Sequence, residues 1–207
     1  MPDVADLATL QSYAARVDVD TLPTGAADFF AALLDARGAG QGRALPASAT
    51  VSIERPALLV CGSRAAWESR QRECEAAGVP ILLVSDPFED LELHIWQAAD
   101  RLAVRGLLAV AIADDWKRTR ESHELLPRLA TVAAMLLEIA PVATVLAEGG
   151  ATAAALARRL AWNHFRVVQT APAGVGVLQP LEIALAPTFL IKPGSYAWPE
   201  EIWQRLK

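Results

Sequence analysis

The feature that most constrains the fold is a regular alternation of short apolar runs and longer amphipathic segments, which begins near Arg55. The apolar runs are typical of buried strands, and the segments between them are typical of helices. Strands that are apolar throughout, rather than at every second residue, indicate a parallel sheet with helices on both faces. The sequence therefore predicts a three-layer, Rossmann-like α/β fold with a mostly parallel sheet.

The expected elements follow one another closely. Strands are predicted at 57–61, 80–85, 106–113, 142–147 and 166–169, with further strand within 181–191. Helices are predicted at 65–77, 91–103, 122–139, 151–161 and 199–206. Two earlier helices, at 6–16 and 26–36, precede a segment at 37–50 that is rich in Gly, Ala, Pro and Ser. We therefore predict an N-terminal helical segment with a linker, residues 1–50, and an α/β domain, residues 51–207, whose function these patterns do not indicate.

The second of the early helices carries a group of large apolar side chains, Phe29, Phe30, Leu33 and Leu34. Two interpretations stay open for this group. It packs on the main domain, or it forms part of a surface that a partner covers.

Charge and composition exclude several classes of function. The chain has 207 residues and a formal charge of −5, with acids and bases interspersed, so it lacks the basic stripe of a nucleic-acid-binding protein. No apolar run approaches the roughly 18 residues of a membrane span, and the N-terminus carries acids where a signal peptide carries bases. Two cysteines do not make a disulfide framework. We expect a cytoplasmic protein without nucleic-acid or membrane partners.

Ligands of parallel sheets bind beyond the carboxyl ends of the strands, so the residues that follow the predicted strands are the candidates for a site. Gly62-Ser63 follows the first strand, Asp114-Asp115 the third, and Glu148-Gly149-Gly150 the fourth. Lys192 ends the last apolar run, just before Pro193-Gly194. Each of these candidates has a functional and a purely structural interpretation.

Gly149 and Gly150 would expose backbone N–H groups at the start of a helix, where the helix dipole favours an anion. Thr152 could add a hydroxyl to the same site. The alternative is a tight turn without a ligand. Gly62-Ser63 has the same form, but an ordinary helix N-cap is the favoured interpretation of Ser63.

The other two candidates also have a structural alternative. Asp114-Asp115 could hold magnesium, although a solvated loop or a helix cap is the favoured interpretation. Lys192 could reach a phosphate, or it could be a surface lysine beside a turn.

Several familiar site motifs are absent from the sequence. It contains no G-x-x-x-x-G-K-[ST] phosphate loop, no G-x-G-x-x-G fingerprint and no G-x-S-x-G elbow. The histidines, His94, His123 and His164, are far apart, so no metal centre is predicted. Neither cysteine has the sequence surroundings of a catalytic nucleophile.

Several stretches, taken in order, resemble a known family. They are DLATLQSYA with PTGAADFFAALL, then LLVCGSRAAWESRQ, LAEGGATAAAL, PAGVGVL and LIKPGSYAWPEEIW. Together they resemble the C-terminal nucleotide-binding half of the four-carbon acid sugar kinases, formerly a domain of unknown function. Those enzymes phosphorylate threonate-like and erythronate-like acids with ATP. The resemblance extends from about Asp6 to Leu206.

The resemblance implies a site for ATP, with Mg²⁺ carried by the nucleotide. The matching positions for nucleotide contacts are Gly62, Ser63, Gly149, Gly150, Ala151, Thr152, Gly174, Lys192 and Gly194. Gln71 matches the glutamine that ends the family's second motif. In this interpretation the paired glycines let ATP phosphates approach the backbone.

The chain also departs from the family pattern. Ala151 stands where the family usually has an acid, Ala197 replaces a glycine, and Ala26 stands where serine is common. The family's acid-sugar-binding half, with its Asp-Asp-Thr-Gly signature, has no counterpart in this sequence.

Three accounts of the chain therefore stay open. The first is the ATP-binding half of a split kinase, or a fragment of a longer one, which is inactive by itself and is completed by a sugar-acid-binding partner polypeptide. The second is a stand-alone nucleotide-binding regulatory or interaction module, and the third is a structural module that binds no nucleotide. A homodimer is compatible with each of them.

Overall fold

The computed structural model describes residues 6–25, 27–39, 53–85, 90–113, 122–170, 174–194 and 196–206. Asp114-Asp115, a candidate magnesium site in the sequence, and Ala26 lie outside the described residues. The chain divides into two compact units, Met1–Ala47 and Ser48–Lys207.

The first unit contains helices α1 (Leu7–Ala14) and α2 (Ala27–Ala36). Helix α1 begins at Asp6, whose carboxylate accepts a hydrogen bond of 2.7 Å from the Thr9 N–H. This capping by an acidic residue explains where the helix starts. A small apolar cluster joins the two helices, with Leu33 buried and Phe29 partly buried, whereas Phe30 is exposed. Some apolar side chains of α2 therefore pack against α1, and others lie on the surface of this unit.

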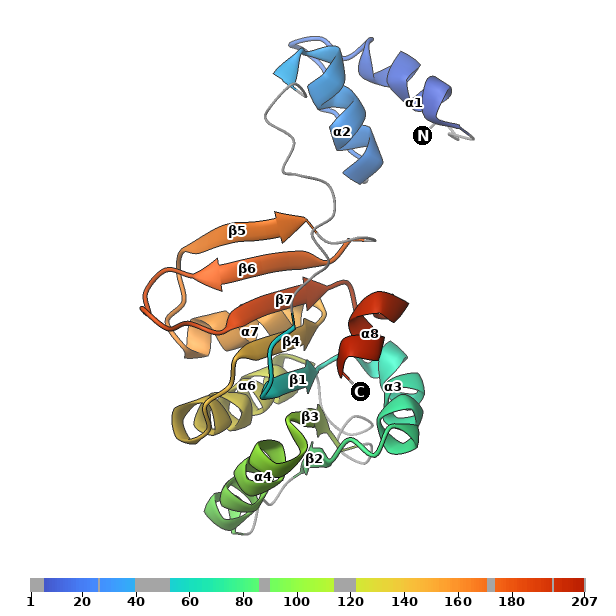
Figure 1. The fold of residues 1–207 in the computed structure, drawn as a ribbon. Helices are drawn as coiled ribbons and strands as arrows, with labels where there is room; N and C mark the ends of the chain where they lie inside the picture. Colours follow the sequence, from blue (N-terminus) through green and yellow to red (C-terminus); the bar gives the residue numbers. More distant parts are fainter. Residues whose placement is uncertain are drawn as a thin grey trace. The chain divides into compact units, whose positions relative to one another are not determined.

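The second unit is built on a sheet with helices on both faces (Figure 1). Its strands are β1 (Ala57–Cys61), β2 (Ile81–Val84), β3 (Leu107–Ile112), β4 (Thr144–Glu148), β5 (Phe165–Thr170), β6 (Gly176–Pro180) and β7 (Thr188–Lys192). Its helices are α3 (Arg64–Ala76), α4 (Leu91–Arg105), α6 (Ser122–Ile139), α7 (Gly150–Arg159) and α8 (Glu200–Leu206).

Within the described residues the sheet has seven strands in the order β2-β3-β1-β4-β7-β6-β5. The five strands from β2 to β7 pair in parallel, and β6 and β5 extend the sheet in antiparallel pairs. The predicted mostly parallel, three-layer α/β fold is confirmed. Among the described helices, none is both long and apolar enough to cross a membrane.

Strand β6 was not predicted. Its sequence, GVLQP, contains glycine and proline, which are unfavourable in strands. It forms because β7 pairs with it on one side and β5 on the other, so tertiary pairing overrides local preference. Gly106, which was placed in a strand, instead ends α4 in the left-handed conformation (φ 72°), as helix-terminating glycines often do.

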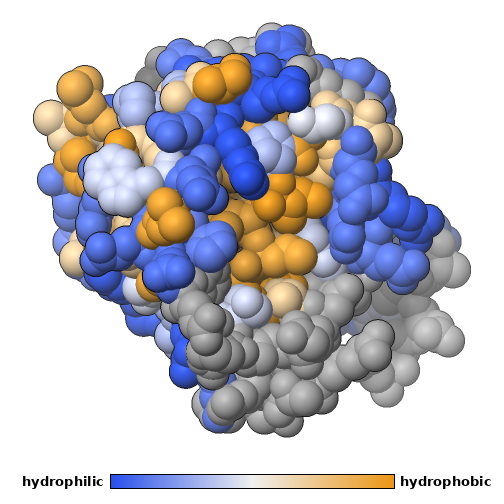
Figure 2. All heavy atoms as spheres, turned by 90° about the horizontal axis from the view of Figure 1, so that it is seen from below, coloured by the Kyte–Doolittle hydropathy of each residue, from blue (hydrophilic) through white to orange (hydrophobic). Residues whose placement is uncertain are grey.

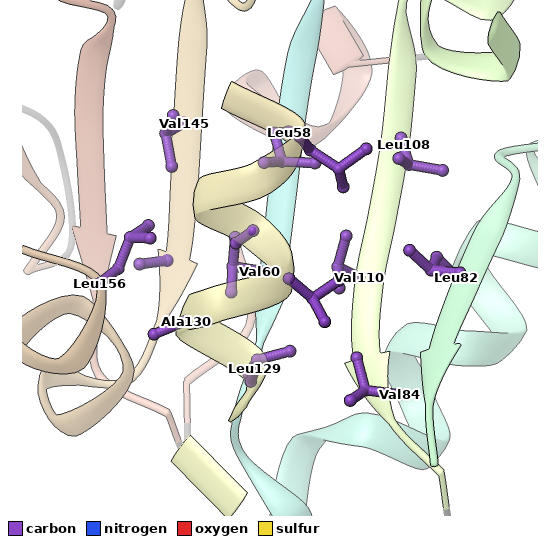
Figure 3. Close-up of a cluster of buried hydrophobic side chains, with 14 of the residues drawn as sticks. Leu58, Val60, Leu82, Val84, Leu108, Val110, Leu129, Ala130, Val145 and Leu156 are labelled. Carbon is purple, nitrogen blue, oxygen red and sulfur yellow. The ribbon is translucent and has the colours of Figure 1, made fainter. Parts of the chain in front are cut away.

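The side chains of the central strands point alternately into two apolar layers. Leu58 and Val60 of β1 face the layer beneath α4, α6 and α7, whereas Leu59 and Cys61 face the layer beneath α3 and α8. Figure 3 shows helix α6 crossing in front of β1, and Leu129 and Ala130 of α6 belong to the same apolar layer as Val60 and Val110. Burial on both faces explains why β1 and β3 are apolar throughout.

Apolar side chains also lie on the surface. Figure 2 shows a group of them near the middle of the face seen from below, between more polar regions. Leu83 of the edge strand β2 and Leu93, Trp96 and Val104 of α4 are exposed. The high apolar fraction of the chain, 53%, is therefore not used entirely in the core.

We predict that Leu58→Ala lowers the free energy of unfolding by about 2–5 kcal/mol, because a cavity would remain between β1 and α6. Leu58 has 0% exposure. Leu83→Ala, in an edge strand where the side chain is 44% exposed, is the matched control and should cost markedly less. Urea unfolding monitored by tryptophan fluorescence measures both. Equal losses would contradict the assignment of β1 to the centre of the core.

A second prediction concerns Glu182. Desolvation by itself would raise the pKa of this carboxyl, but the N–H groups of Asn163 and His164 donate to it at 2.9 and 2.7 Å. Together with the His164 ring at 3.0 Å, these bonds lower the pKa of Glu182 to about 2 from a usual 4.5. A lowered pKa in the folded state stabilises the protein above about pH 4.5, and that stabilisation disappears as the pH falls toward about 2.

Glu182→Gln should therefore be less stable than the wild type at about pH 7. The difference should shrink steadily as the pH falls below about 4.5. Thermal unfolding of both proteins across this range measures the effect. A difference that is independent of pH would contradict the carboxylate interpretation.

Candidate functional site

The candidate site lies where the connections of neighbouring strands diverge. Strands β1 and β4 are adjacent, yet α3, which follows β1, packs on one face of the sheet, and α7, which follows β4, packs on the other. Such a switch of direction opens a crevice at the carboxyl edge, the usual ligand position in open parallel sheets. Gly62-Ser63 and Gly149-Gly150 are the residues at this point of the chain.

The loops after β1, β4 and β7 come together at this edge. The Ser63 hydroxyl donates to the Gly194 carbonyl at 3.1 Å, and the Gly149 N–H donates to the Lys192 carbonyl at 2.8 Å. A Cβ atom added to Gly194 would lie 3.1 Å from the Ser63 Cβ and 3.6 Å from the Gly149 Cα. Residues far apart in sequence that were predicted to share a site are therefore neighbours.

The fold itself requires several of these glycines. A Cβ at Gly62 would overlap the Thr152 hydroxyl and lie 2.8 Å from Leu126 Cδ2. The packing at Gly194 is less severe, since a Cβ there would lie 3.0 Å from the Ser63 Oγ and 3.1 Å from the Ser63 Cβ, a tight contact rather than an overlap. Gly149 has φ +98° and Gly174 has φ +76°, a region that other residues rarely adopt. Packing or backbone geometry is thus a sufficient reason for each of these four residues.

Gly174 lies in the turn between β5 and β6. Because Gly176, at the start of β6, pairs with Ile191 near the end of β7, this turn belongs to the same edge of the sheet.

Gly150 differs from the other glycines of the site. It begins α7, its φ is not positive, and a Cβ atom there would meet nothing within 4 Å. Ala151 beside it is exposed, whereas Thr152 is buried next to Gly62. The first turn of α7 therefore presents one bare, accessible position that neither packing nor backbone geometry explains.

Ser63 occupies the N-cap position of α3, but its side chain makes no capping bond. Its hydroxyl is directed instead to Gly194, so the interpretation of Ser63 as an ordinary cap is wrong. Gly149, the N-cap residue of α7, has no side chain to cap with. Neither N-cap residue thus satisfies the first-turn N–H groups of its helix with a side chain, which favours binding of an anion there.

Directly below the loops lies a buried cluster of charges, Arg70, Glu148 and Lys192. Glu148 and Lys192 end the adjacent strands β4 and β7 and are register partners. The Glu148 Oε1 atom lies 2.8 Å from Arg70 Nε and 3.2 Å from Lys192 Nζ. The exposures of the Glu148, Lys192 and Arg70 side chains are 0%, 1% and 3%. The second carboxylate oxygen of Glu148 has no hydrogen-bond partner among the described residues.

The Lys192 ammonium is further held by backbone carbonyls. It donates to Tyr196 at 2.6 Å and to Pro193 at 3.2 Å, and it lies 5.3 Å from the ring centre of Trp198. Burial lowers the pKa of Lys192, while the Glu148 carboxylate acts in the opposite direction. The interpretation of Lys192 as a surface lysine is wrong, and direct contact with a phosphate would require it to exchange one of these acceptors.

Arg70 connects the cluster to two helices. Its guanidinium pairs with Glu73 in α3 and lies 4.7 Å from the ring centre of Trp203 in α8. Neither Arg70 nor the pairing of Glu148 was predicted from the sequence. The charges at the ends of two apolar strands were the available signal, but the adjacency of β4 and β7 is not readable from the sequence. Gln71, by contrast, bonds to Glu75 on the exposed surface of α3.

The described residues offer little metal or thiolate chemistry. No group of three or more His, Cys, Asp or Glu side chains within them could hold a metal ion. Cys61 and Cys74 are buried free thiols. Burial raises the pKa of Cys61 well above its usual value and that of Cys74 to about 12. Both thiols therefore stay protonated near neutral pH and are poor nucleophiles.

Comparisons with known proteins gave matches among solved structures. No family model matches the chain, and no curated protein matches it. A DUF1537 protein of Haemophilus influenzae has a TM-score of 0.62 at 18% identity, over 99% of this chain and 52% of its own. A DUF1537 protein of Bordetella bronchiseptica, a domain-swapped dimer with bound citrate, has a TM-score of 0.55 at 19% identity, over 99% and 51%.

A third solved structure, from Salmonella typhimurium LT2 and provisionally described as a tRNA synthase, has a TM-score of 0.63 at 17% identity, over 98% and 50%. Likenesses at these identities establish the fold. Two of the three similar structures are DUF1537 proteins. The chain spans about half the length of these neighbours.

The contrast between Gly62 and Gly150 gives a testable prediction. Gly62→Ala should destabilise the protein by about 1–3 kcal/mol through overpacking against Thr152, and Gly62→Ala with Thr152→Ala should recover part of the loss. Gly150→Ala should be neutral or stabilising by up to about 1 kcal/mol, because alanine is the better helix former and the space is open. Urea unfolding measures all three variants. A large loss in Gly150→Ala would mean that the fold itself requires this glycine.

Proposed function

We propose that the chain is the ATP-binding, C-terminal domain of a four-carbon acid sugar kinase, lacking the half that binds the sugar acid. Ordered sequence motifs that resemble this family and a fold like that of DUF1537 proteins over half their length support the proposal. The latter likeness is consistent with a family that was formerly a domain of unknown function.

The observation that carries the proposal is Gly150. Glycine inside a helix typically costs about 0.5–1 kcal/mol relative to alanine. Gly150 is the first residue of α7, and neither backbone geometry nor packing requires a glycine there. A ligand that approaches the backbone closely supplies the missing reason. The location at the carboxyl edge, beside the uncapped start of α7, suits a phosphate group.

The chemistry of this edge fits a nucleoside triphosphate. Backbone N–H groups at the starts of α3 and α7 would bind the phosphates, and the helix dipoles favour their negative charge. Bound Mg²⁺ would neutralise phosphate charge during transfer. Since the described residues contain no group of ligands for a metal by themselves, magnesium would arrive with the nucleotide. The buried Lys192 would hold the turn after β7 through the carbonyls of Pro193 and Tyr196.

Phosphoryl transfer depends on positioning the acceptor hydroxyl in line with the terminal phosphate. The proposed donor site gives no position for a sugar acid, so we propose that an acceptor half outside residues 1–207, on a partner polypeptide or on the same longer chain, completes the enzyme. Residues 1–207 by themselves are then inactive. A second copy of the chain is another partner to consider. Among the structural neighbours, the Bordetella bronchiseptica protein is a domain-swapped dimer.

A second candidate function is a stand-alone nucleotide-binding module without kinase activity. The exposed Ala151 favours it. In the family that the sequence resembles, an acid usually stands at this position, next to the nucleotide phosphates. Loss of that carboxylate is compatible with binding but less so with catalysis. The two candidates share the nucleotide site and differ in the requirement for an acceptor partner.

The proposal predicts that the purified protein binds ATP and ADP with micromolar affinity, and that Gly150→Asp abolishes the binding. The new carboxylate would repel the phosphates and occupy their position, while the open space at Gly150 keeps the protein folded. Isothermal titration calorimetry with and without Mg²⁺ measures the affinities. Leu93→Asp is the control, because it adds the same charge at an exposed position in the first turn of α4.

Absence of binding by the wild type up to millimolar nucleotide would contradict the proposal. Equal losses of affinity in Gly150→Asp and Leu93→Asp would contradict the location of the site. Binding without transfer to threonate or erythronate is expected of the isolated chain under both candidate functions.

A further inference from the structure

We infer that Arg70, Glu148 and Lys192 form a positioning cluster that holds the loops after β1, β4 and β7 in the arrangement that binds phosphate. This inference rests on the proposed function, since it concerns the same site. It assigns a role to charged side chains that are buried and bonded to one another and to the backbone. The cluster acts through the loops rather than by touching the nucleotide.

The contacts form a closed ring. Arg70 of α3 pairs with Glu148 at the end of β4, and Glu148 pairs with Lys192 at the end of β7. Lys192 holds the turn after β7 through the carbonyl of Tyr196. In that same turn the Gly194 carbonyl accepts from Ser63, at the start of α3. The ring therefore returns to the helix where it began and includes a residue from each of the three loops or their strands.

Register explains why the cluster controls the loops. Cys61, Glu148 and Lys192 pair across β1, β4 and β7. Each is the last residue of its strand. In each case a glycine follows within two residues. A shift of Glu148 relative to Lys192 would move Gly149 relative to Gly194. The Gly149 N–H, bonded to the Lys192 carbonyl, would be the first group affected.

Stability is a poor explanation for such a cluster. Burying charges carries a large desolvation penalty, and well-packed apolar residues of similar volume often serve a core equally well. The surrounding layer is apolar and includes Trp198 and Trp203, so an apolar substitute was available. Among the residues that the structure describes, the buried charged side chains are these three, and their position next to the loops favours a role at this edge of the sheet.

The net charge of the cluster is the alternative explanation for an effect on an anion. Arg70 and Lys192 carry two positive charges, and Glu148 and the partly exposed Glu73 carry two negative charges, so these four side chains have no net charge. We assign the main effect to geometry, however, because Lys192 is fully buried and already bonded to carbonyls. Two substitutions in the cluster separate the two effects.

Lys192→Met removes the ammonium and keeps a side chain of similar length. Glu148→Gln keeps the shape and removes the ion pairs. Both variants should bind ATP about tenfold more weakly, which corresponds to the loss of one charge-assisted hydrogen bond. Their affinity for adenosine, which has no phosphate, should be unchanged. Calorimetry of wild type and variants with both ligands measures this difference.

Thr144→Val is the matched control. Thr144 is buried at the other end of β4, and its hydroxyl is hydrogen-bonded to the backbone of Glu54. The substitution should lower the thermal unfolding temperature without weakening ATP binding. It therefore separates a general loss of stability from a specific effect on the loops.

Residue-resolved hydrogen exchange provides a readout that does not depend on a ligand. In Lys192→Met and Glu148→Gln the amides of Gly149 and Tyr196, which bond to Lys192 and Pro193, should exchange at least about tenfold faster. This is the same tenfold factor in an opening equilibrium. In Thr144→Val these two amides should keep their wild-type rates. Glu148→Gln decides the matter if Lys192→Met does not fold.

Three outcomes would overturn the inference. The first is an ATP affinity of the folded cluster variants within about twofold of the wild type. The second is tighter ATP binding by Glu148→Gln, which would assign the effect to net charge. The third is an unchanged exchange rate of the Gly149 and Tyr196 amides. If the wild type itself binds no ATP, the proposed function fails, and the exchange rates alone then decide whether the cluster positions the loops.

Discussion

The site depends on one buried carboxylate. Glu148 Oε1 lies between the guanidinium of Arg70 and the ammonium of Lys192, at 2.8 and 3.2 Å. Removing one partner from such a buried pair typically destabilises a protein by about 3–5 kcal/mol, because a charge is left uncompensated. The contact links α3, β4 and β7 at the point where each strand gives way to a glycine-containing loop. The mutual positions of these loops follow from it.

The topology of the sheet explains why a site forms at this edge. Strands β1 and β4 lie side by side, and their following helices depart to opposite faces. The loops at this edge pack closely, which accounts for Gly62 and Gly194. Gly150 is left without a packing reason, and we propose that a ligand supplies it.

Much of this arrangement was predictable from the sequence. Apolar runs gave the central strands, and β1 and α6 have the predicted limits. The clustering of Ser63, Gly149 and Gly194 followed from their position after parallel strands. Strand β6 was not predicted, because its glycine and proline are unfavourable in strands. The role of Arg70 was not predicted, because the strand order that brings β4 next to β7 is a property of tertiary packing. The hydroxyl of Ser63 bonds to Gly194 rather than to its own helix, which no local pattern indicates.

The central claim is that nucleotide phosphates bind at the edge formed by the loops after β1, β4 and β7. An NMR titration of the labelled protein with MgATP, following individual backbone amides, tests it most directly. We expect the amides of Ser63, Gly149, Gly150 and Gly194 to shift together and saturate, while those of Leu181 and Leu185, on the exposed loop between β6 and β7, do not move. Unchanged shifts at Gly149 and Gly150, or saturable shifts confined to another surface, would contradict the claim.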